Sequence, residues 1–108
     1  GVALVAGGSG PGDSNWLAST EIFDPVSRQW SRGPAMGTKR EGLGLCMLAD
    51  GTAIASGGTG DSRLTSTEIF SVAAGGWTPG PVLDSERRSP SACLLVDGSV
   101  LLCGGLGG

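Results

Sequence analysis

The glycines that follow a short apolar run at residues 2–6 are the first candidates for chemistry in this chain. A strand that enters a glycine-rich loop can hold the pyrophosphate of a dinucleotide. The spacing GxGxxG does not occur within residues 2–12, however, and Pro11 lies inside the loop. An apolar run with a double glycine occurs three times along the chain, which repeated structure explains and nucleotide binding does not. The glycines are therefore predicted to be structural, and no cofactor is expected.

The side chains that most often carry acid–base or metal chemistry are scarce. The chain contains no His and, by composition, no Tyr, so the commonest general acid–base group and zinc ligand is missing. The three cysteines form no CxxC pair and are expected to be small buried residues on strands. Loop acids, of which Asp61 and Glu86 are examples, usually form solvated turns. We therefore expect neither a metal site nor a catalytic site in this chain.

Charge and hydropathy exclude two further classes of function. The 108 residues carry a formal net charge of −3, and scattered arginines on an acidic chain are a poor match for a nucleic-acid backbone. No apolar run approaches the ~20 residues that span a bilayer. Neither nucleic acid nor membrane is expected as a partner.

The chain repeats itself with a period of 47 residues. The segment Ser-Thr-Glu-Ile-Phe at 19–23 recurs at 66–70, and an Asp-Gly pair at 50–51 recurs at 97–98. Only the loop after the first double glycine differs, because it is three residues longer. A loop that changes length while its flanks keep register is typical of a surface loop on a repeated unit.

Each repeat is predicted to hold four short strands. Apolar runs of ~5 residues have the length of strands rather than helices. Asp-Gly between two such runs predicts a tight hairpin, since that turn needs positive φ. The nine predicted strands cover residues 2–6, 20–23, 29–32, 43–49, 52–56, 67–70, 76–78, 91–96 and 99–103. A four-stranded unit of about 40–50 residues is typical of one blade of a β-propeller.

These residues resemble the kelch motif. The motif's double glycine, acidic–aromatic strand, tryptophan, proline and arginine match, in the second copy, Gly57-Gly58, Glu68-Ile69-Phe70, Trp77, Pro81 and Arg87. The first copy offers Gly7-Gly8, Glu21-Ile22-Phe23, Trp30, Pro34 and Arg40, and a third double glycine stands at Gly104-Gly105. Phe occupies the place where kelch repeats often carry Tyr, and Met36 becomes Leu83.

The resemblance implies an all-β fold: about two antiparallel kelch-type blades cut from a β-propeller. Residues 1–36 would supply strands 2–4 of one blade, 37–83 a complete blade, and 84–108 strands 1–2 of another. The double glycines would admit a closely packed neighbour, while Trp30 and Trp77 would pack between blades. Glu21 and Glu68 would pair with an arginine. Open strand edges at both ends predict that further blades, or copies of the chain, complete the ring.

In kelch-like rings two sets of loops meet at one rim, and the resemblance places the binding candidates there. They are Asp13, Asn15, Trp16, Asp61, Arg63, Arg40, Arg87 and Arg88. Arginines at this rim could bind carboxylates bidentately, although Arg40 and Arg87 are repeat positions and could instead serve the repeat structure. We predict a scaffold that binds a protein or peptide, or else a carbohydrate. The alternative is a non-catalytic segment of a galactose-oxidase-like or carbohydrate-active propeller enzyme.

Overall fold

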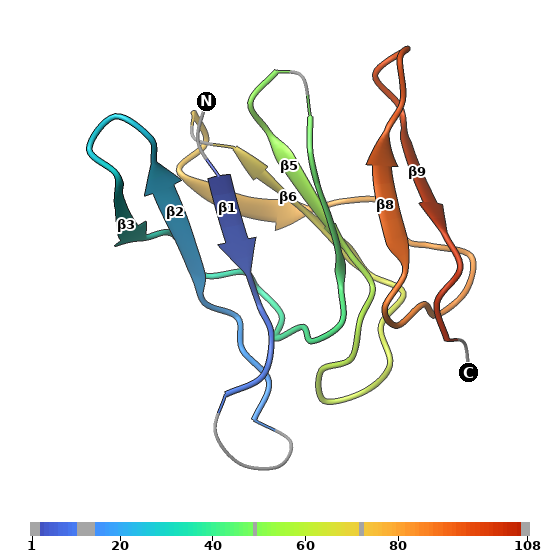
Figure 1. Cartoon of the computed structure of the whole chain (residues 1–108). Coiled ribbons are helices and arrows are strands. Elements are labelled where there is room, and N and C mark those ends of the chain that lie inside the picture. Colours follow the sequence, from blue (N-terminus) through green and yellow to red (C-terminus); the bar gives the residue numbers. More distant parts are fainter. Residues whose placement is uncertain (1–2, 11–14, 49, 72, 107–108) are drawn as a thin grey trace.

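The computed structural model describes residues 3–10, 15–48, 50–71 and 73–106, and within them it is all β (Figure 1). Three antiparallel sheets follow one another along the chain. The first holds β1 (Ala3–Ala6), β2 (Thr20–Asp24) and β3 (Gln29–Arg32); the second holds β4 (Gly44–Met47), β5 (Ala53–Ser56), β6 (Thr67–Ser71) and β7 (Gly76–Pro79); the third holds β8 (Ser91–Leu94) and β9 (Val100–Cys103). The predicted fold class, all-β with nine antiparallel strands grouped as in propeller blades, is confirmed for the described residues.

Within every sheet, strands that are consecutive in sequence are neighbours in space. The register of the second copy repeats that of the first: Phe23 lies opposite Trp30, and Phe70 lies opposite Trp77. The three-, four- and two-stranded sheets lie within residues 1–36, 37–83 and 84–108, respectively.

The Asp-Gly hairpins are closed by the aspartate side chain. Asp50 Oδ1 accepts hydrogen bonds from Thr52 N at 3.0 Å and from Thr52 Oγ1 at 2.6 Å, and Gly51 adopts φ of 88°. Asp97 makes the same two bonds, with the same lengths, to Ser99. The hydroxyl bond first, and the amide bond second, lower the pKa of both aspartates. Each turn is thus a local motif that depends on residues adjacent in sequence.

The double glycines allow the linker that leads into the following sheet to pass directly over the end of a strand. Gly57 and Gly58 have φ of 65° and 91°, and a Cβ on Gly57 would stand 2.7 Å from the carbonyl oxygen of Arg87. That same oxygen accepts a hydrogen bond from Gly58 N at 2.8 Å, as the carbonyl oxygen of Arg40 does from Gly8 N at 2.7 Å. A side chain here would push the two segments apart.

The core lies between the first two sheets. Ala6 on β1, Met36 in the linker and Ala55 on β5 form a buried cluster, and Trp77 packs against it. On the other side of the second sheet, β4 lies beside β8. The core is therefore an interface between blades, as expected for sheets that cannot bury both faces alone.

The burial predicted for the cysteines is wrong for two of the three. Cys46 on β4 is buried, whereas Cys93 and Cys103 are exposed. The reason is positional: β8 and β9 have the second sheet on one side only, and no described residue covers their other side.

Candidate functional site

The loops of the molecule are sorted between its two ends. The loops that follow the double glycines and the linkers between sheets lie toward the lower end in Figure 1, and the Asp-Gly hairpins lie at the upper end. Isolated β-bridges join Glu41 to Thr59 and Arg88 to Leu106 at the lower end. We call this the loop end and define it as residues 9–10, 15–18, 37–43, 59–65 and 84–90.

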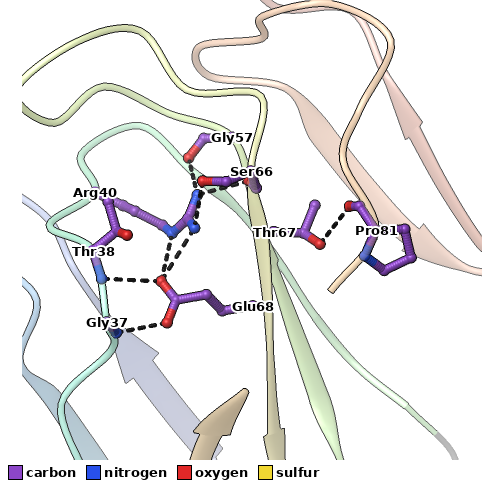
Figure 2. Close-up of polar contacts among 8 residues, drawn as sticks. All are labelled: Gly37, Thr38, Arg40, Gly57, Ser66, Thr67, Glu68 and Pro81. Carbon is purple, nitrogen blue, oxygen red and sulfur yellow. Dashed lines mark hydrogen bonds and ion pairs between the residues drawn. The ribbon is translucent and has the colours of Figure 1, made fainter. Parts of the chain in front are cut away.

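Arg40 lies at the centre of a buried polar network (Figure 2). Its guanidinium group has no exposed surface. Nε and Nη2 donate to Glu68 Oε2 at 3.2 and 3.1 Å, and Nη1 donates to the carbonyl oxygens of Gly57 and Ser66 at 3.0 and 2.8 Å. Nη2 also donates to Ser66 Oγ at 2.9 Å. The buried charge is thus both paired and hydrogen-bonded, which is the condition for keeping it inside a protein.

The same carboxylate holds the linker from the first sheet. Glu68 Oε1 accepts from Gly37 N at 2.6 Å, and Oε2 accepts from Thr38 N at 3.1 Å. Glu68 therefore fastens residues 37–40 onto β6. Arg40 consequently serves the interior of the second sheet and is not available to a partner at the loop end, which corrects its place among the binding candidates.

Arg87, in the linker to the third sheet, is the repeat equivalent of Arg40, and Glu21, in the first sheet, is the repeat equivalent of Glu68. Each sheet therefore contains only one of the two charged residues of this network. Arg87 is half-buried, and its Nη1 donates to the carbonyl oxygen of Gly104 at 3.0 Å, as Arg40 does to Gly57. No described residue supplies the serine and glutamate that would complete it. Glu21 is exposed and has no polar partner among the described residues.

The repeat tryptophans differ in the same way. Trp77 is half-buried, and its Nε1 donates to the carbonyl oxygen of Pro34 in the preceding sheet at 3.0 Å. The Trp30 ring packs at a tilt against Phe23, as the Trp77 ring does against Phe70, but Trp30 remains 51% exposed. Trp77 therefore bridges two blades, whereas Trp30 has no described blade to contact.

Three of the remaining binding candidates meet at one place on the loop end. Arg63, Arg87 and Arg88 surround a small hollow between the loop of the second sheet and the linker to the third. Gly58, Glu86 and Leu106 complete its lining. Arg63 and Arg88 are exposed.

A wider hollow of about 330 Å³ lies between the first linker and the loop of the second sheet. Asp61 lines it together with Gly37, Thr38, Lys39, Ser62 and Leu64. Asp61 and Lys39 are exposed, so this hollow offers one charge of each sign.

The candidates on the first loop are set apart from these two hollows. Trp16 is half-buried and forms a β-bridge with Ser9, and Asn15 is exposed. Neither lines either hollow. Asp13 lies outside the described residues. The structure therefore divides the predicted site into the arginine cluster, the wider hollow lined by Asp61 and a separate first loop.

Sequence reasoning missed Ser66 and the amides of Gly37 and Thr38 as parts of the network. A signal was available for Ser66, because serine recurs at the same repeat position as Ser19. No such signal exists for residues 37 and 38, whose repeat equivalents are Asp84 and Ser85. Backbone amides bind through their position, which side-chain identity does not report.

Among the described residues, no three His, Cys, Asp or Glu side chains gather as a metal site would require. In the part of the chain that the structure describes, no helix has the length and apolarity to cross a membrane.

Comparison with known proteins identifies the first copy of the repeat. The family model of the Kelch motif matches residues 1–37, which include β1 to β3. A search of curated proteins found no match to this chain. The matched segment contains the double glycine, the acidic–aromatic strand and the tryptophan that recur 47 residues later.

Proposed function

Because this chain is a kelch-repeat protein, we propose that it belongs to a propeller that binds a protein or peptide partner through the loop end. Kelch repeats suggest an interaction scaffold, and the loop end is where side chains depart from the repeat. Arg63 stands at the repeat position that Trp16 occupies in the first copy, and Arg88 stands at the position of Glu41. Residues that differ between copies are not required by the repeated structure, which makes them candidates for contact with a partner.

The observation that carries the proposal is the arginine cluster. The chain has seven lysines and arginines in total and a net charge of −3, yet three of those seven cations surround a single hollow. A guanidinium group presents paired N–H donors that match a carboxylate. The preferred partner is therefore a segment that carries Asp or Glu side chains.

Nothing specific favours the enzymatic alternative. If the chain were a non-catalytic segment of a carbohydrate-active or galactose-oxidase-like enzyme, the catalytic groups would lie outside it, since the chain itself has no His or Tyr. We therefore propose binding without catalysis for this chain.

The test is a binding scan of the full chain against an array of acidic peptides. The double variant Arg63→Ala/Arg88→Ala should weaken the best binders about tenfold or more, as expected for lost charge-assisted hydrogen bonds. The matched control is Arg28→Ala/Arg32→Ala, which removes the same charge from the β2–β3 hairpin and should leave affinity unchanged. Equal losses in the two double variants would mean non-specific attraction and would contradict the proposal.

The variant Trp16→Ala tests whether the partner contacts the first loop in addition to the arginine cluster. If the partner also reaches the first loop, this variant should weaken binding while the unfolding transition stays in place. Unchanged affinity would restrict the site to the arginine cluster.

A further inference from the structure

The wider hollow of the loop end is lined by two opposite charges that do not pair with each other. Its linker wall, residues 37–39, carries Lys39, and its loop wall, residues 61–64, carries Asp61. Neither side chain makes a hydrogen bond or an ion pair with a described residue. One side-chain hydroxyl on each wall also lines the hollow without a described partner. The hollow thus combines donors and acceptors that the fold itself leaves unused.

This hollow lies at a junction where the described chain supplies the segments on both sides. The linker contacts the first loop, because Arg40 N donates to the carbonyl oxygen of Leu17 at 3.0 Å. The loop of the second sheet is followed by the linker into the third sheet, where Gly58 N donates to the carbonyl oxygen of Arg87 at 2.8 Å. None of the lining residues belongs to a strand, and the two walls lie toward the lower end in Figure 1. The hollow is therefore open because loops surround it, and not because a strand is without its neighbour.

Both walls of the hollow are fixed by hydrogen bonds within the chain. Glu68 accepts bonds from two backbone amides of the linker wall. At the start of the loop, Thr59 and Glu41 exchange two backbone N–H···O bonds of 2.8 Å. A Cβ on Gly60 would overlap the carbonyl oxygen of Lys39, so the loop and the linker are in direct backbone contact. A ligand would thus enter a preformed site, which lowers the entropic cost of binding.

The charges of the linker wall are particular to this junction. At the repeat position of Lys39 the next linker has Glu86, and at that of Gly37 it has Asp84. Residues that differ between copies are not required by the repeated structure. The hollow has a volume of about 330 Å³, within the range of about 300–1,000 Å³ that is usual for small-molecule sites. The hollow therefore has the size, as well as the unused polar groups, of a site for a small ligand.

We propose that this hollow binds a small zwitterion of the size of a dipeptide, with its carboxylate at Lys39 and its ammonium group at Asp61. A ligand with a single charge would meet a like charge in the hollow, whereas a zwitterion presents the opposite charge to each wall. The hydroxyls of Thr38 and Ser62 can accept from the ammonium group and donate to the carboxylate, and Leu64 supplies an apolar surface for a side chain. The site shares no lining residue with the arginine cluster, so it stands apart from the loop-end partner.

The experiment titrates the full chain with the dipeptide alanyl-leucine and with its N-acetylated and C-amidated forms, followed by ¹H–¹⁵N nuclear magnetic resonance. The unmodified dipeptide should shift the amide signals of residues 37–39 and 61–64 saturably. Acetylation removes the ammonium charge and amidation removes the carboxylate charge. Each modification should therefore weaken binding about fivefold, the upper scale of one exposed ion pair.

Two variants assign each end of the ligand to its wall. Asp61→Asn should weaken binding of the unmodified dipeptide about fivefold, and this variant should no longer distinguish it from the acetylated form. Lys39→Gln should behave in the same way toward the amidated form. Both side chains are exposed, so neither variant should move the unfolding transition. The matched control is Asp84→Asn, which removes an exposed acid of the next linker, outside the hollow, and should leave the affinity unchanged.

Three outcomes would overturn the proposal. The first is no saturable shift in a chain that circular dichroism shows to be folded. The second is equal affinity for the unmodified dipeptide and for both blocked forms, because the two charges of the hollow would then not contribute to binding. The third is a set of shifts confined to Arg63, Arg88 and their neighbours, because the carboxylate would then bind the arginine cluster instead of the hollow.

Discussion

The second sheet and its two neighbours have nearly the same local structure and different surroundings. Phe70 and Trp77 lie with ring centroids 5.3 Å apart, and Phe23 and Trp30 lie 5.2 Å apart. Phe70 is 5% exposed whereas Phe23 is half-buried, and Trp30 is 51% exposed whereas Trp77 is half-buried. The geometry of a strand pair is therefore a property of the pair, whereas burial depends on the sheets at either side.

The burial of the polar residues also depends on the neighbouring sheets, and it has a larger effect on the free energy of unfolding. Glu68 is buried and binds Arg40, Gly37 and Thr38, whereas Glu21 is exposed without a described polar partner. An identical five-residue segment thus supplies a central structural contact in one place and a surface charge in the other. The predictions below compare matched positions in the two settings.

The largest difference is expected at the glutamates. Glu68→Ala would leave the Arg40 charge buried without its partner and should lower the free energy of unfolding by about 3–5 kcal/mol. Glu21→Ala removes an exposed carboxylate and should change it by less than about 0.5 kcal/mol. Urea denaturation of the two variants and the parent chain measures both. Similar losses would mean that the first sheet is completed in solution as well.

The tryptophans should show the next largest difference. Trp77→Ala removes a half-buried ring and its bond to Pro34, and should cost about 3 kcal/mol, the lower end of the range for large aromatic side chains. Trp30→Ala should cost about 1 kcal/mol, since half of that ring already contacts water. Thermal unfolding followed by far-ultraviolet circular dichroism compares them. A cost at Trp30 equal to that at Trp77 would show that another surface covers the first sheet.

The double glycines separate backbone conformation from close packing. Gly57→Ala and Gly104→Ala place a side chain at similar φ, 65° and 71°, so each should lose about 1–2 kcal/mol for the left-handed conformation. Only Gly57→Ala also meets the carbonyl oxygen of Arg87, so it should be the more destabilising of the two. Urea midpoints give the difference, and equal midpoints would refute the role assigned to the crossing linker.

The smallest effect is expected where the sheets do not differ. Hydrogen bonds to Thr52 and Ser99 lower the pKa of Asp50 and Asp97. An aspartate whose pKa is lower in the folded chain than in the unfolded chain stabilises the fold at pH values above its unfolded-state pKa. This stabilisation is lost as the pH falls through the folded-state pKa. Carboxyl titration by nuclear magnetic resonance should place both groups below ordinary aspartate. Asp50→Asn and Asp97→Asn should each remove part of the acid-dependent loss of stability, and a normal pKa at either residue would contradict the turn described for it.

Most of the fold could be predicted from the sequence because its signals are local. Short apolar runs, Asp-Gly pairs and the 47-residue repeat predicted nine strands, and the structure has nine in the described residues. Burial could not be predicted in the same way. Cys46 and Cys93 share a repeat position, yet one is buried and the other is exposed, because only Cys46 has sheets on both sides.

The candidate site was predictable in composition but not in arrangement. The resemblance to the kelch motif indicated which loops meet, and the sequence identified Arg63 and Arg88 as departures from the repeat. It could not show that Arg63, Arg87 and Arg88 meet at one hollow while Trp16 lies elsewhere, because loop side chains are positioned by contacts between sheets.

The sequence by itself determined the strands, the hairpin turns and their order, since each depends on residues within a few positions of one another. Only the tertiary structure decided what each repeated residue does. Arg40 is interior because β6 brings Ser66 and Glu68 to it, and Arg87 is half-exposed because no described strand does so. The physical reason is that the cost of burying a charge depends on its partners in space, and a repeat in sequence does not guarantee a repeat of neighbours.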